Sequence, residues 1–278
     1  MKKILFLFLL VFFLSCSREE FDTQVYFILA GQLYSMNTDG SDIKRLTNDS
    51  NTYYSVSSSP CAEYIVLSTD TNKIYTMRYD GENFAYLMDG QYATYGPSGR
   101  IYFITGPSSN IVARYNPSNG STEYLETMVS GSNMLYSPSC NRDETILVFY
   151  WWNSGPSYLA RKSLVTPYTL VTIPTATVNC FYPSFSPTDD RILTIKTAAP
   201  YYIRIMSPDN IPSDIYLRTG TSLSTRPAWT ADGEHIYFAD NSATTNAIKI
   251  MNSDGSGART IAEFSSSIDC LCVQGKPR

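Results

Sequence analysis

Residue types and motifs that common enzyme sites require are scarce in this chain of 278 residues. There is one histidine, His235, so a zinc site of the H-E-x-x-H kind, which needs two, is excluded. No G-x-S-x-G stretch occurs, so the nucleophile turn of a serine hydrolase is missing. The paired carboxylates at 19–20 and 189–190 fall in an expected tether and an expected turn, where charge is normally solvated. We therefore expect no catalytic residue, no metal and no cofactor.

The chain also has fewer positively than negatively charged residues. The chain carries 21 Lys and Arg against 25 Asp and Glu, a formal net charge of −4, with no basic cluster. This balance gives no electrostatic footprint for nucleic acid, so we expect no nucleic-acid partner. Apolar residues make up 43% of the sequence, which is enough to bury a sizeable core.

Long apolar runs are missing, apart from one of eleven residues at 4–14. As a helix it would rise about 16 Å, too little for a hydrocarbon core of about 30 Å. With Lys2 and Lys3 before it, the run is typical of an export signal rather than a membrane anchor. It ends in "FLSC", which resembles the lipobox of bacterial lipoproteins, although Phe13 stands where Leu is usual. The resemblance implies that Cys16 is lipidated and becomes the mature N-terminus. The alternative is an ordinary secretory signal with an incidental cysteine.

The predicted organisation follows from this signal. Residues 1–15 form a signal peptide, 16–23 a lipidated cysteine with a short acidic tether, and 24–278 one folded domain. The stretch "SREEFD" has no Asp directly after Cys16, and its acidity resembles the surface-export signal of Bacteroidetes lipoproteins. We expect an outer-membrane lipoprotein of the bacterial cell envelope, held by its N-terminal lipid. Whether it faces the periplasm or the surface stays open.

A repeat organises the folded part. "LYSMNTDG" at 33 returns as "IYTMRYDG" at 74 and "IKIMNSDG" at 248, with weaker copies at 113 and 203. Gly40 and Gly255 lie 215 residues apart, which corresponds to five steps of 43 residues. Four-stranded propeller blades have periods of about 40–45 residues. The slot at 157–168 has no Asp-Gly, so its turn is degenerate.

Each repeat reads as four strands, which we name A to D in chain order. The predicted B strands start near Val25, Tyr64, Arg100, Thr145, Ile192 and His235. The chain begins directly with a B strand, so the A strand of blade one must come from "SIDCLCV" at 267–273. Such pairing of the two ends closes the ring and leaves no long open edge. We predict an all-β, six-bladed propeller of four-stranded antiparallel blades.

The repeated motifs resemble the TolB-like six-bladed β-propeller family, which has WD40-like repeats. The clearest stretches are 36–47, 183–192, 227–238 and 251–260, and the resemblance covers nearly all of 24–273. TolB itself carries an additional N-terminal α/β domain that contacts partner proteins. Only about eight residues separate Cys16 from the first strand, so we expect that domain to be missing. The resemblance therefore implies the fold and not TolB's role.

Five cysteines remain besides Cys16. They are Cys61, Cys140, Cys180, Cys270 and Cys272. An odd number cannot pair completely, although the compartment outside the cytoplasm permits disulfides. No other Cys or His cluster supports a metal site at "CLC", so we favour buried apolar thiols. The Asp-Gly stretches lack the further carboxylates of a calcium loop, and we interpret them as hairpin turns that need a positive φ.

A propeller presents loops at both ends of its central channel, which favours a binding function. Aromatic residues and one arginine lie near the ends of the D–A and B–C loops. The candidate ligand-binding residues are Tyr53, Tyr54, Tyr92, Trp151, Trp152, Tyr201 and Arg226. Aromatic rings and arginine are typical of protein-recognition hot spots, and rings also stack on sugars. The alternative is that most of these rings pack between blades.

The favoured hypothesis is a monomeric, non-enzymatic envelope protein that binds a protein or peptide. The first alternative is a carbohydrate-binding surface lipoprotein, whose partner would be a glycan. A hydrolase or lyase with carboxylates from different blades also stays open.

Overall fold

The computed structural model describes residues 23–128, 133–153, 157–173, 180–196, 202–207, 213–217, 225–241 and 245–273. The predicted signal peptide, Cys16, most of the tether and Tyr201 lie outside these residues. Within them, no helix has the length and apolar character needed to cross a bilayer.

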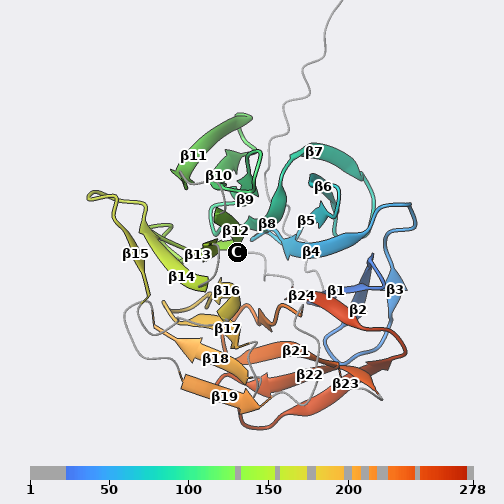
Figure 1. Ribbon diagram of the computed structural model, residues 1–278. Coiled ribbons are helices and arrows are strands. Elements are labelled where there is room, and N and C mark those ends of the chain that lie inside the picture. Colours follow the sequence, from blue (N-terminus) through green and yellow to red (C-terminus); the bar gives the residue numbers. More distant parts are fainter. Residues whose placement is uncertain are drawn as a thin grey trace, which may run out of the picture.

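The described strands form six four-stranded antiparallel sheets arranged around a central axis (Figure 1). We number these blades along the chain and give each from its inner strand outward. Blade one contains β24 (Ile268–Val273), β1 (Gln24–Leu29), β2 (Gln32–Asn37) and β3 (Lys44–Arg45). Blade two contains β4 (Tyr53–Ser58), β5 (Tyr64–Thr69), β6 (Lys73–Arg78) and β7 (Ala85–Asp89).

The third and fourth blades follow the same order. Blade three contains β8 (Gln91–Tyr95), β9 (Ile101–Thr105), β10 (Ile111–Asn116) and β11 (Ser121–Thr127). Blade four contains β12 (Asn133–Cys140), β13 (Ile146–Asn153), β14 (Ser157–Ser163) and β15 (Leu170–Thr172).

The last two blades lead back to the start of the chain. Blade five contains β16 (Cys180–Phe185), β17 (Ile192–Lys196), β18 (Tyr202–Met206) and β19 (Ser213–Leu217). Blade six contains β20 (Ala228–Trp229), β21 (His235–Asn241), β22 (Asn246–Asn252) and β23 (Arg259–Phe264).

The ring closes as the sequence predicts. The C-terminal strand β24 pairs antiparallel with β1, placing Val273 opposite Val25 and Leu271 opposite Phe27 (Figure 1). The inner strand of blade one thus comes from the end of the chain. The prediction of six four-stranded blades with this closure is confirmed.

The hydrophobic core is divided among the six blade interfaces. In β1, Val25 and Phe27 pack in a cluster with blade six, while Tyr26 and Ile28 pack in a cluster with blade two. The other four clusters join the remaining neighbouring blades in the same way. Successive strand residues point to opposite faces of a sheet, and both faces are covered here. This explains why the B strands read as continuous apolar runs rather than alternating ones.

The Asp-Gly motifs form the turns between C and D strands. Gly40 and Gly255 have φ values of +90° and +88°, which favour glycine. At the first turn, Asp39 Oδ1 accepts hydrogen bonds from the backbone N and the hydroxyl of Ser41, at 2.9 and 2.6 Å. These bonds lower the pKa of Asp39. The carboxylate therefore holds its own turn, as the hairpin interpretation expects.

The same turns also contact the preceding blade. A Cβ on Gly40 would clash with the carbonyl oxygen of Ile261 in β23, and one on Gly255 with that of Ile215 in β19. A tyrosine of the preceding B strand adds a hydrogen bond, because the Tyr237 hydroxyl donates to the Thr38 carbonyl at 2.9 Å. The repeated motif thus encodes the approach of one blade to the next as well as a turn.

Candidate functional site

The inner strands are irregular near the ends where the D–A loops enter. Register shifts interrupt β8 between Gln91 and Thr94, β12 between Tyr136 and Ser139, and β16 between Phe181 and Ser184. Bulges of this kind bend a strand and redirect its side chains. Tyr92 and Tyr182, with φ of +53° and +56°, lie within two of these shifts.

Tyrosines from four blades meet at this level of the channel. We call Tyr54, Tyr92, Tyr136 and Tyr182 the tyrosine plug. The rings of Tyr54 and Tyr92 are 5.0 Å apart, and those of Tyr92 and Tyr136 are 5.3 Å apart. Burial, followed by the neighbouring phenols, raises the pKa values of Tyr54 and Tyr92. Tyr182 of blade five contributes to both pKa shifts, although blade five lies across the ring from blade two, which carries Tyr54. The tyrosine plug therefore narrows the channel at this level.

Beyond the plug, the channel widens into a cavity of about 380 Å³ at the end where the A–B turns lie. We call this cavity the vestibule. Its lining comes from all six blades: residues 56–60, 94–97, 139–140, 142, 184–187, 226–232 and 271–273. Exposed side chains at its rim, such as Arg142 and Asp232, show that it opens to solvent. The vestibule is therefore a concave site held by a rigid frame of six inner strands.

Polar side chains at matching positions link the inner strands around the vestibule. Backbone N–H groups donate to the preceding blade: Tyr95 to Ser57 Oγ at 3.1 Å, and Phe185 to Ser139 Oγ at 3.1 Å. In blade one a thiol takes the place of the hydroxyl, because Ser58 N donates to Cys272 Sγ at 3.2 Å. These contacts fix the spacing of the strands and give the lining a polar character.

Arg226 is the buried cation of the vestibule. Its side chain belongs to the lining, although the residue is only 8% exposed. It lies at a parallel bridge between blade six and Cys270 of β24. Its charge opposes the effect of burial on the thiol of Cys270, whose pKa burial raises to about 11. A positive charge therefore faces the cavity from one side of its wall.

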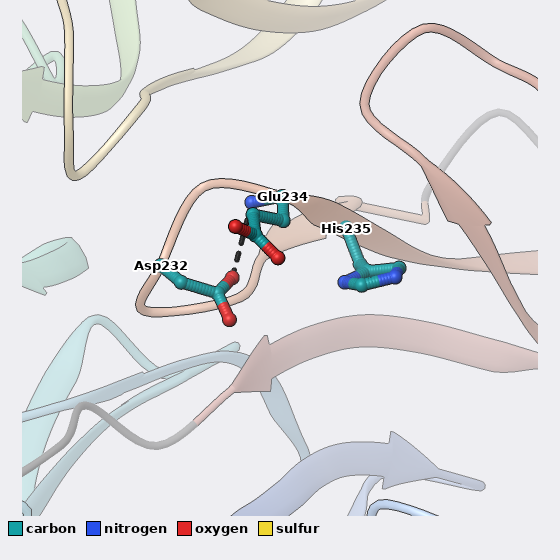
Figure 2. A group of neighbouring side chains, drawn as sticks. All are labelled: Asp232, Glu234 and His235. Atoms are coloured by element: carbon teal, nitrogen blue, oxygen red, sulfur yellow. Dashed lines mark hydrogen bonds between the residues drawn. The ribbon is translucent and has the colours of Figure 1, made fainter.

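A small cluster of possible metal ligands lies in the A–B turn of blade six. Figure 2 shows Asp232, Glu234 and His235, whose ligand atoms lie within 4.8 Å of one another. Asp232 Oδ1 accepts hydrogen bonds from Glu234 N at 3.0 Å and from the hydroxyl of Thr230 at 2.5 Å. These bonds hold the turn, as expected for an Asp-Gly motif. No fourth His, Cys, Asp or Glu of the described residues joins the cluster.

A second hollow, of about 560 Å³, lies between blades two and three. Tyr64, Tyr95 and Tyr115 line it together with Leu87 and Ile101. Its wall is more apolar than that of the vestibule and includes half-buried aromatic rings, so it is a candidate groove for a flat apolar surface.

The predicted ligand-binding residues fall in different environments. Tyr54 and Tyr92 belong to the plug, and Arg226 lines the vestibule. Tyr53 is 1% exposed, and its hydroxyl donates to Asp49 at 2.6 Å. Tyr201 is outside the described residues.

The two tryptophans of β13 separate as alternation predicts. Trp151 packs against the core between blades three and four, and its ring lies 5.5 Å from that of Tyr158. Trp152 is half-buried and belongs to none of the described core clusters. The structure does not bring either residue to the vestibule.

Sequence reasoning missed several residues of the site. Tyr136 and Tyr182 complete the plug, and both stand one or two positions before the proline of an inner strand, in "LYSPS" and "FYPSF". That pattern was a usable signal. The vestibule itself lies at the A–B turns, whereas the aromatic residues had directed attention to the D–A and B–C loops.

No protein-family model matches the sequence, and no curated protein sequence matches it. Among solved structures, the chain is similar to TolB from Acinetobacter baumannii, with a TM-score of 0.77 and 13% identity over 93% of this chain and 68% of that one. It is also similar to a chain of a nidogen/laminin complex, with a TM-score of 0.70 and 10% identity over 91% and 98% of the two chains.

A third similar structure is an oligogalacturonate lyase in complex with manganese, with a TM-score of 0.56 and 11% identity over 88% and 74% of the two chains. At such identities these similarities concern the overall fold alone.

Proposed function

We propose that the chain is a non-enzymatic binding protein, anchored in the bacterial outer membrane through lipid on Cys16, which holds a segment of another envelope protein in its vestibule. The observation that carries this proposal is the vestibule itself: a cavity of about 380 Å³ that opens to solvent and is framed by all six inner strands. Concave, pre-formed sites with a few placed polar groups are the usual binding sites of proteins. A propeller frame adds little conformational entropy cost on binding because its backbone is already fixed.

The lining suits an extended peptide. Hydroxyls such as that of Ser184 can accept from or donate to a peptide backbone, and the prolines and aromatic residues of the wall offer apolar contact. Among the similar structures, TolB and the chain in the nidogen/laminin complex support a binding function for this shape of propeller.

Catalysis is less favoured. Of the described lining residues, Asp232 is the one carboxylate, whereas glycoside hydrolysis uses a pair. The similarity to a manganese-bound lyase leaves a hydrolase or lyase as the third hypothesis.

Carbohydrate binding is the second candidate, and the groove between blades two and three favours it. Tyr64, Tyr95 and Tyr115 supply rings on which sugars can stack, with the polar side chains of Asn83 and Asn116 nearby. Carbohydrate binding would be supported if immobilised glycans retain the chain, if Tyr115→Ala abolishes this retention, and if vestibule variants keep it.

A variant that fills the vestibule tests the main proposal. Ser184 is half-buried in the cavity wall, and Ser184→Trp would place an indole in the space. Ser50→Trp is the matched control, because Ser50 is exposed in the D–A loop at the opposite end of the blades. After cross-linking in intact envelopes, we expect a stoichiometric protein partner with the native chain and with Ser50→Trp, and none with Ser184→Trp. Equal recovery with both variants would contradict the proposal.

A further inference from the structure

Arg226 differs in charge from the residues at the equivalent position of the other inner strands. It stands directly before a proline, as Ser137 and Tyr182 do in blades four and five. The equivalent position of blade three holds Tyr92. The other blades thus place aromatic rings or small polar groups here, and blade six places a full positive charge.

This charge has no fixed counter-ion. Arg226 takes part in none of the ion pairs within 4 Å, and in none of the side-chain hydrogen bonds, found among the described residues. The charge of Arg226 acts on the Tyr182 phenol and on the thiols of Cys270 and Cys272, and the Asp269 carboxylate acts on Tyr182 and Cys270 as well. At ordinary pH the phenol and the two thiols are neutral, because burial raises the pKa of Tyr182 to about 12 and that of Cys270 to about 11, and also raises the pKa of Cys272.

A guanidinium that is nine-tenths buried and forms no ion pair within 4 Å is energetically unfavourable. Removing a cation from water costs several kcal/mol unless an anion or good hydrogen-bond acceptors replace the water. In this protein the open side of Arg226 is the vestibule, which is large enough to admit a ligand. An anionic ligand group that enters the vestibule would therefore replace water as the partner of Arg226.

The geometry of arginine selects among anions. Its planar fork of N–H donors matches a carboxylate, which accepts two parallel hydrogen bonds. At the rim, Arg142 adds a second positive charge and Asp232 a negative one, so the buried end of the vestibule is more attractive to an anion than its mouth.

We infer that Arg226 forms a carboxylate-binding subsite at the buried end of the vestibule. The segment bound there presents an Asp or Glu side chain, or a terminal carboxylate, to the guanidinium. This inference rests on the proposed function, since it specifies the chemistry of the segment that the vestibule holds.

Selection from a random peptide library on the immobilised full chain tests the inference. Twelve-residue peptides are displayed with free C-termini, and the selection is repeated on Arg226→Met, Arg226→Lys and the control Arg259→Met, because Arg259 is exposed on the outer strand β23 and lies outside the vestibule lining. We expect native-chain peptides to share an acidic residue or a required C-terminal carboxylate. Arg226→Met should select peptides without this preference, Arg226→Lys should retain part of it, and Arg259→Met should retain it fully. Thermal unfolding of each variant verifies that it is folded.

Synthetic peptides then identify the source of the carboxylate. Replacing the acidic residue by its amide, or amidating the C-terminus, should weaken binding to the native chain at least tenfold, which corresponds to about 1.4 kcal/mol. The same change should weaken binding to Arg226→Met less than twofold. An equal loss on both chains, or native-chain peptides with no acidic preference, would overturn the inference while leaving vestibule binding intact. Binding that survives Ser184→Trp, or no selected peptide at all, would overturn the proposed function and the inference with it.

Discussion

Replacing the turn glycines by alanine tests how the blades pack. Gly40 and Gly120 occupy equivalent C–D turns, and both have positive φ values, +90° and +71°. An alanine at either position therefore adopts a left-handed conformation, at a cost of about 1–2 kcal/mol. The neighbourhoods differ, because a Cβ on Gly40 would clash with the Ile261 carbonyl oxygen of the preceding blade, whereas one on Gly120 would have no heavy atom within 4 Å.

The size of the difference follows from the contact. Relieving a clash with fixed backbone requires the turn or the neighbouring strand to move, and overpacking of this kind costs about 1–3 kcal/mol. We expect Gly120→Ala to lose about 1–2 kcal/mol and Gly40→Ala about 2–5 kcal/mol. Gly255→Ala should resemble Gly40→Ala, since it would clash with Ile215.

Urea and thermal unfolding of the three variants measure these losses. For a domain of this size, each kcal/mol lowers Tm by about 2–4 °C. Equal losses at Gly40 and Gly120 would refute the contact between the first turn and blade six. They would leave positive φ as the sole reason for the glycines.

Three further predictions concern blade contacts and the lipid anchor. Cys272→Ala removes the sulfur that accepts a hydrogen bond from Ser58 N, whereas Cys272→Ser keeps an acceptor. In chemical unfolding, Cys272→Ala should therefore lose about 1 kcal/mol more stability than Cys272→Ser. Equal stability of the two variants would rule out that hydrogen bond. Burial raises the pKa of Glu144, but hydrogen bonds from Ser98 and the charge of Arg100 outweigh it and leave that pKa below the ordinary 4.5. Glu144→Gln should therefore lower the free energy of unfolding by about 1–3 kcal/mol at neutral pH. The difference in stability between the two chains should vanish as the pH falls below about 4.5 and through the native pKa of Glu144. A difference that stays constant with pH would contradict this contact between blades three and four. Metabolic palmitate labelling should disappear in Cys16→Ser, and labelling that persists would exclude lipid on that residue.

The fold could be predicted because its signals are local and repeated. The spacing of the turn glycines Gly40 and Gly255 predicts the length of the repeat, and that length predicts the number of blades. The predicted B-strand starts agree closely with the structure. Three of them, Tyr64, Ile192 and His235, coincide with the first residues of β5, β17 and β21. The assignment of β24 to blade one needed only the count of A strands.

The site could not be predicted in the same way, because it depends on contacts between distant blades. Tyr54 and Tyr182 are far apart in sequence, and neither has a motif that places it on the channel axis. The bulges that redirect Tyr92 and Tyr182 depend on register, which turn residues do not reveal. Arg226 was selected for its residue type, whereas its burial and its lack of a counter-ion became visible only in three dimensions.

One degenerate repeat shows how local sequence and blade contacts depend on each other. The hydroxyl of Tyr26 reaches the carbonyl of Tyr79 in the next Asp-Gly turn at 3.5 Å, and Tyr237 contacts Thr38 in the same way. Tyr102 occupies the equivalent position in blade three, but the next blade, blade four, has no Asp-Gly turn. The Tyr102 hydroxyl instead accepts a hydrogen bond from Arg114 at 3.4 Å.

Photocross-linking from position 184 tests binding in the vestibule most directly. A benzoylphenylalanine at Ser184 reports on molecules inside the cavity, and the same group at Ser50 reports on the opposite end of the blades. In intact cells we expect a discrete adduct with one envelope protein from position 184, mapped to an acidic segment of that protein, and no such adduct from position 50. An adduct from position 50 alone, or none from position 184 in a folded, membrane-bound chain, would contradict binding in the vestibule.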